Sequence, residues 1–194
     1  MFHTIKPYHQ TGKRKVILMP YTIVLDAGHG GANPGATYNG RQEKDDALRL
    51  TLAVGRLLEN AGMNVVYTRT DDSYDSPARK AEKANEAGGD YFISIHRNSS
   101  VYPNQYTGIE SIVYNRSGAA AKMAENINEN LQALGFVNHG VSERTNLVVL
   151  NRTQMPAVLV EAGFINNDSD NAIFDSRFDE LAQAIADGIL DSIP

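Results

Sequence analysis

The sequence predicts a single α/β domain in which helices flank a twisted, mostly parallel sheet of about six strands. Short apolar runs rich in β-branched residues alternate with segments whose apolar residues recur at helical spacing. Neither a linker nor an internal repeat interrupts this alternation after residue 20. A chain of 194 residues is also long enough to bury roughly 70% of its unfolded surface in one core. These observations together favour one layered domain.

The expected strands are apolar runs bounded by turn-forming residues. They lie at about residues 22–28, 64–68, 91–95, 108–114, 147–150 and 157–161. Strands that alternate with helices in this way usually pair in parallel.

Four helices are expected between and after these strands. They span about residues 43–61, 77–87 and 117–134, and the last begins at about residue 177. The second of them opens with Ser76 as its N-cap and Pro77 in the first helical position, which is a strong start signal. Glycine follows each of the first three helices, as is common at helix ends.

Composition excludes several classes of protein. The formal net charge of −5 argues against a general nucleic-acid binder, which would normally be basic. The absence of cysteine excludes disulfides and a cysteine-based structural zinc site, although it does not identify the compartment. No run reaches the length of about 18 apolar residues that a membrane span needs.

Residues 1–20 are expected to form a tail or an extra edge segment that precedes a domain at 21–194. The basic residues 13–15 and the apolar run after them superficially resemble a signal peptide. Pro20 interrupts that run, and no small-residue cleavage site follows. No clear signal peptide is therefore expected.

Three apolar runs each end on a residue that can bind or assist a metal, namely His29, His96 and Glu161. Ligands of α/β sheets bind outside the carboxyl ends of the strands, where these residues would lie. Glu43 stands fourteen positions after His29, at the start of the first helix. Catalytic zinc sites use three ligands of the histidine and carboxylate type. We therefore expect His29, Glu43 and His96 to hold one zinc ion.

Glu161 has a different expected role, that of general base and acid. A carboxylate at the end of an apolar strand is costly to desolvate unless it is paired or used. Beside a zinc ion, which lowers the pKa of a bound water to about 7, it could accept a proton and return it to a leaving amine. The ion would also polarise the carbonyl group that is attacked.

Each residue also has a purely structural interpretation. His29 could cap a turn in its glycine-rich loop, and Glu43 could be an acidic residue favoured by the helix dipole. The loop at 28–31 could bind an anion, although it lacks the Lys-Ser/Thr pair of a P-loop. The other three histidines are left outside the metal site: His3, His9 and His139.

Together these segments resemble the zinc-dependent N-acetylmuramoyl-L-alanine amidases, the catalytic domains of bacterial autolysins and phage endolysins. The resemblance covers about residues 21–192 and rests on several motifs in the same order as in the family. The matching segments are 25–31 with 34–36, 43–45, 68–69 with Asp72, Arg79 with 84–85, 92–96 with Asn98, and 155–164 with Asn167.

The resemblance implies that His29, Glu43 and His96 bind zinc and that Glu161 is the catalytic base and acid. The implied reaction is hydrolysis of the amide bond between N-acetylmuramic acid and L-alanine in peptidoglycan. The protein would then act at the bacterial cell wall, outside the cell or in the periplasm. With no wall-binding repeat visible, targeting would come from a separate partner or from the domain itself.

Substrate contacts are implied for Arg69, Asn85 and Asn98. The chain departs from the family pattern at Arg97, where small residues are usual, and at His139, where an arginine is common. The segment 114–117 leaves no room for the inhibitory insertion that some members carry, so the site should be open.

Two alternatives remain for the function. A zinc metallopeptidase that cuts a wall peptide would need the same metal ligands, and neither composition nor spacing separates it from an amidase. A non-catalytic peptidoglycan-binding module is disfavoured because all four expected site residues are present. The sequence indicates neither the oligomeric state nor whether a cell, a spore or a phage produces the protein.

Overall fold

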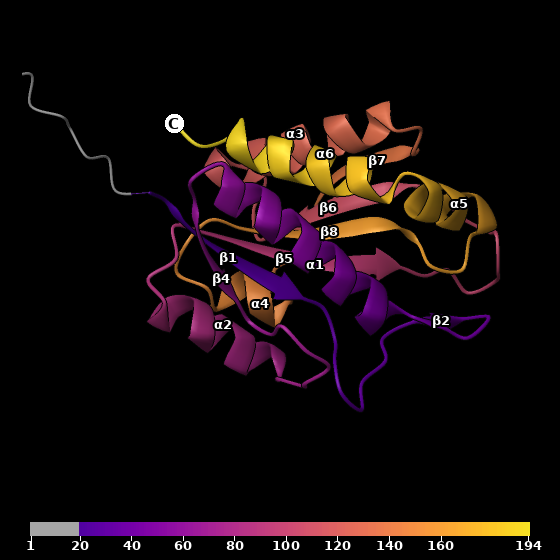
Figure 1. Ribbon diagram of the computed structural model, residues 1–194, viewed down its shortest axis with the longest axis horizontal. Helices are drawn as coiled ribbons and strands as arrows, with labels where there is room; N and C mark the ends of the chain where they lie inside the picture. Colours follow the sequence, from indigo (N-terminus) through magenta and orange to yellow (C-terminus); the bar gives the residue numbers. More distant parts are fainter. Residues whose placement is uncertain (1–19) are drawn as a thin grey trace, which may run out of the picture.

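A six-stranded sheet runs through the computed structural model, which describes residues 20–194 (Figure 1). Its strands are β1 (Thr22–Ala27), β4 (Asn64–Tyr67), β5 (Tyr91–Asn98), β6 (Ile109–Val113), β7 (Asn138–Glu143) and β8 (Ala157–Phe164). They are ordered β4-β1-β5-β8-β6-β7, and only the β6–β8 pair is antiparallel. The expectation of a mostly parallel sheet of about six strands is confirmed.

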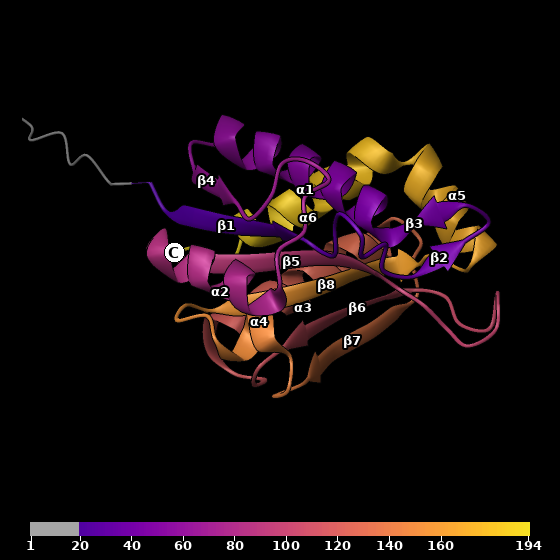
Figure 2. The same ribbon diagram turned by 90° about the horizontal axis from the view of Figure 1, so that it is seen from below.

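Helices cover the two faces of the sheet unequally. The long helices α1 (Glu43–Asn60), α3 (Gly118–Ala133) and α6 (Phe178–Leu190) lie together on one face. Figure 2 shows the shorter α2 (Pro77–Glu86) and α4 (Val148–Asn151) on the other face. The four expected helices are thus present, and α5 (Asp168–Ser176) is an additional one that the apolar pattern did not indicate.

Strand alternation divides the interior into two cores. In β1, Ile23 and Leu25 belong to the large core beneath α1, α3 and α6, whereas Val24 belongs to a small core beneath α2 and α4. The same alternation along β5 sends Ile95 to the large core and leaves His96 on the face of α2 and α4. The candidate site therefore lies on the face with the lighter helical cover.

One expected strand is wrong. The run at 147–150 forms the one-turn helix α4 and packs Val149 and Leu150 into the small core. The sixth strand is instead β7 at the edge of the sheet, where Val141 is the only buried residue. An edge strand with one buried apolar side chain carries little hydrophobic alternation, which explains why the pattern did not reveal it.

A two-stranded hairpin precedes α1 beyond the carboxyl end of β1 (Figure 2). It consists of β2 (Thr37–Tyr38) and β3 (Arg41–Gln42). The turn residues Asn39 and Gly40 both have positive φ, which is typical of a tight hairpin turn.

The expectation of a tail or edge segment at residues 1–20 lies outside the described residues, apart from Pro20. Within residues 20–194, none of the helices is long and apolar enough to cross a membrane.

Candidate metal centre

His29 follows β1 in a tight loop and has an unusual backbone conformation. Its φ of 59° lies in the left-handed region, which non-glycine residues rarely adopt. Residues with such a conformation cluster at functional sites. Its Nδ1 lies 3.1 Å from Oδ1 of Asn33. Since an amide oxygen only accepts, Nδ1 carries the proton and Nε2 keeps its lone pair for a metal.

Glu43 is the first residue of α1 and is almost completely buried. Its Oε2 accepts from the Ala36 amide at 2.9 Å, and its Oε1 accepts from the Arg97 amide at 3.1 Å. Burial alone would raise the pKa of this carboxyl, but its contacts with His29 and His96 outweigh burial and hold the pKa well below its ordinary value. Glu43 is therefore an oriented carboxylate.

His96 completes the cluster from β5. Its Nδ1 lies 2.8 Å from Oε1 of Glu43, and Nε2 of His29 lies 3.0 Å from the same oxygen. Burial opposes protonation of His96, yet the Glu43 carboxylate outweighs it and raises the pKa of the imidazole. A Cβ on Gly28 would come within 2.4 Å of the His96 ring, so this close approach requires glycine.

The donor atoms of His29, Glu43 and His96 all lie within 4.8 Å of one another. Two imidazole nitrogens and a carboxylate oxygen form the ligand set of catalytic zinc sites. The residues therefore fit a divalent metal ion, and the predicted trio is brought together from a loop, a helix start and a strand.

Glu161 lies beside this cluster on β8, where it is the cross-strand partner of His96. Its Oε2 is buried and has no hydrogen-bond partner among the described residues. Burial raises the pKa of this carboxyl to about 7, with Glu43 and Glu110 adding to the effect and His96 opposing it. A buried carboxyl with an unused oxygen and a pKa near neutrality suits proton transfer.

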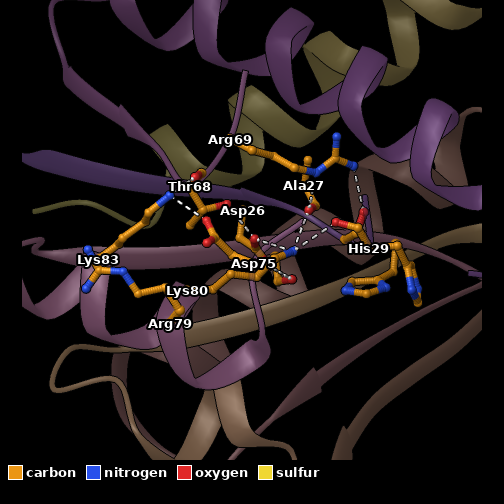
Figure 3. Close-up of polar contacts among 12 residues, drawn as sticks. Asp26, Ala27, His29, Thr68, Arg69, Asp75, Arg79, Lys80 and Lys83 are labelled. Atoms are coloured by element: carbon orange, nitrogen blue, oxygen red, sulfur yellow. Dashed lines mark hydrogen bonds and ion pairs between the residues drawn. The ribbon is translucent and has the colours of Figure 1, made fainter. Parts of the chain in front are cut away.

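Two buried cations, Lys80 and Arg69, contact the end of β1 and the start of the loop that carries His29 (Figure 3). Lys80 of α2 pairs with Asp26 at 2.9 Å and donates to the Ala27 carbonyl at 2.7 Å. Arg69 donates to the carbonyls of Ala27 and Gly28 at 3.1 and 2.8 Å. These contacts fix the three residues that precede His29. Sequence reasoning did not identify the Asp26–Lys80 pair.

Arg97 points away from the cluster, into the layer between the sheet and α1. Its guanidinium lies 2.7 Å from Asp46 and 2.8 Å from Asn171, and stacks 4.1 Å from the Phe174 ring. It also donates to the carbonyls of Gly163 and Phe164. The departure from the family pattern at this position therefore changes the packing between the sheet and α1. It does not change the face of the sheet on which His96 lies.

The three expected substrate contacts lie in different settings. All four hydrogen bonds of the Arg69 guanidinium go to main-chain carbonyls, so this side chain stabilises the surrounding backbone. Asn85 joins α2 to the segment after α4 through Arg152 and Gln154. Asn98 is half-buried two residues beyond His96, and its amide oxygen accepts from Ser99. Of the three, Asn98 has the position most suited to reaching a ligand.

His139 lies on β7, and its Nε2 contacts the Thr107 carbonyl at 2.7 Å. It is not among the three residues whose donor atoms lie within 4.8 Å of one another.

The sequence of this chain is similar to those of known amidases. The family model described as N-acetylmuramoyl-L-alanine amidase matches residues 23–191. A sporulation-specific N-acetylmuramoyl-L-alanine amidase of Bacillus subtilis is 39% identical over 173 residues, covering 86% of this chain and 66% of that protein. The probable cell wall amidase LytH of Staphylococcus aureus is 35% identical over 182 residues, covering 91% of this chain and 60% of that protein.

The fold agrees as well. The crystal structure of an N-acetylmuramoyl-L-alanine amidase from Clostridium difficile 630 matches with a TM-score of 0.82 and 32% identity, covering 89% of this chain and 96% of that one. The chain spans slightly less than two thirds of the length of the two curated relatives. With the family model matching most of its length, the chain belongs to the N-acetylmuramoyl-L-alanine amidase family.

Proposed function

We propose that this chain is a zinc-dependent amidase that hydrolyses the bond between N-acetylmuramic acid and L-alanine in peptidoglycan. The observation that carries the proposal is the His29–Glu43–His96 cluster with the unpartnered carboxyl of Glu161 beside it. The family to which the chain belongs and the amidases it is similar to supply the substrate class.

One zinc ion held by His29, Glu43 and His96 would act as a Lewis acid toward the scissile carbonyl and make water more acidic. Asn33 fixes the tautomer of His29, and the Arg97 and Ala36 amides fix the Glu43 carboxylate. Glu161 accepts a proton from the attacking water and returns it to the L-alanine nitrogen as that amine leaves. Asn98, half-buried beyond His96, is the proposed substrate contact.

Action at the bacterial cell wall follows from this substrate. A separate wall-targeting partner stays a prediction, because no binding surface for such a partner has been identified among the described residues.

The test separates ligation from proton transfer. Glu161→Gln should retain zinc, measured by metal analysis of the purified protein, while turnover falls by roughly 10²–10⁴-fold, as expected for a general acid-base group. His96→Ala should lose both zinc and activity. Release of zinc by both variants alike would make Glu161 a ligand and overturn its assigned role.

The bond is identified from the digestion products of purified peptidoglycan. Amine labelling and mass spectrometry should find new L-alanine amino termini and no new reducing sugar ends. New amino termini on D-alanine or on the diamino acid would instead assign an endopeptidase. New reducing ends would assign a glycosidase.

A further inference from the structure

A cavity of about 300 Å³ opens beside the metal cluster, on the face of the sheet covered by α2 and α4. The rings of His29 and His96 line one part of it, and Val148, Val149 and Leu159 line another. Its volume is at the lower end of the range for small-molecule sites. It therefore has room for one sugar-sized group next to the reacting carbonyl.

The charges at this cavity are already compensated. Asp26 and Lys80, which line it, pair with each other at 2.9 Å and are 1% and 4% exposed. Asp75 at its rim pairs with Lys83 (Figure 3). A carboxylate or ammonium group entering the cavity would lose its hydration without gaining an uncompensated counter-charge. The cavity therefore suits a neutral group with apolar surface.

The position of Glu161 indicates which half of the substrate occupies the cavity. Glu161 is not among the residues that line the cavity, and its cross-strand neighbour on the far side is Glu110 of β6. If Glu161 protonates the leaving amine, the peptide half leaves past Glu161 and β6. The acyl half then extends from the metal cluster toward the cavity.

The two halves also differ in charge. The stem peptide carries a free carboxylate on its second residue, whereas the muramoyl group is neutral while its lactyl carboxyl is bound as an amide. Its acetamido group offers a methyl and an amide to a wall of valine and leucine side chains. Tyr74, which is 51% exposed at the rim, offers an aromatic face to a sugar ring.

We infer that this cavity, hereafter the sugar cavity, binds the N-acetylated muramoyl sugar on the acyl side of the scissile amide. The inference rests on the proposed function and adds to it the substrate group that the region around Val148 and Tyr74 recognises.

The experiment uses two substrates that share the scissile bond. They are N-acetylmuramoyl-L-alanyl-D-isoglutamine and its sugar-free analogue, lactoyl-L-alanyl-D-isoglutamine. The variants are Val148→Trp, which fills the cavity, and Tyr74→Ala, which changes an exposed rim residue and should leave the fold intact. The controls are Val65→Trp, at a half-buried valine on the opposite face, and Tyr114→Ala, at a tyrosine of similar exposure that does not line the cavity.

Both cavity variants should lower kcat/KM for the muramoyl substrate by ~10-fold or more while changing the lactoyl substrate by less than about twofold, as for a contact with one substrate group. The controls should leave the ratio of the two values unchanged. An equal loss on both substrates, or no loss on either, would overturn the sugar assignment. If the unmodified protein cuts neither substrate nor peptidoglycan, the proposed function itself fails, which is a distinguishable result.

Discussion

Glu161→Gln should remove a pH-dependent loss of stability from the metal-free protein. The pKa of Glu161 is raised from 4.5 to about 7 because the carboxyl is buried. Between these pH values the folded protein holds a proton at this site that the unfolded chain has released. The free energy of unfolding must therefore fall as the pH rises through this window.

The size of the effect follows from the same two values. A difference of one pKa unit corresponds to about 1.4 kcal/mol, so the rise from 4.5 to about 7 costs about 3 kcal/mol once the group is ionised. That cost is absent below pH 4.5 and fully present above pH 7. Glutamine does not ionise, so the variant should gain this amount relative to the parent protein as the pH rises.

Urea unfolding in the presence of a chelator at pH 5, 6, 7 and 8 measures the difference. Comparing the two proteins across pH removes the constant cost of burying an amide, and contributions common to both, such as that of Glu43, largely cancel. Glu125→Gln, at an exposed glutamate of α3, is the control and should run parallel to the parent. Parallel curves for Glu161→Gln as well would refute the assignment of a buried, protonated carboxyl.

Three further predictions concern the support of the metal site. Arg97→Ala should lower the free energy of unfolding by about 3 kcal/mol, the lower end for breaking a buried ion pair, because Arg41 still contacts Asp46 at 2.6 Å. A urea-measured loss below about 1 kcal/mol would contradict this reading of the buried pair. Asn33→Ala should weaken zinc binding roughly 10–100-fold through loss of His29 orientation, with little change in stability, in a chelator competition assay. Unchanged zinc affinity would show that Asn33 does not orient His29. Gly28→Ala should displace His96, since the added Cβ would lie 2.4 Å from its ring, and should also weaken zinc binding. Parent-like affinity in that variant would mean the loop relaxes without moving the ligand.

The fold class and the proximity of His29, Glu43 and His96 could be predicted from the sequence alone. Apolar runs mark the strands because burial between two helical layers demands them, and ligands of such sheets gather at the strand ends. That rule was enough to expect His29 and His96 close together, and the start of the first helix added Glu43. The structure places these three donor groups within 4.8 Å of one another.

Other features depend on contacts between residues far apart in the chain. The edge strand β7 forms by pairing with β6, which compensates for its weak apolar pattern, and the apolar run at 147–150 becomes α4 because it can bury two side chains beneath the sheet. Arg69 resembled a substrate contact in sequence, but the loop carbonyls take its hydrogen bonds. The Asp26–Lys80 pair joins residues that are 54 positions apart, and no local pattern encodes it. Local sequence determines which residue types stand at the strand ends, whereas only tertiary packing decides which of them are buried, paired or left free to act on a ligand.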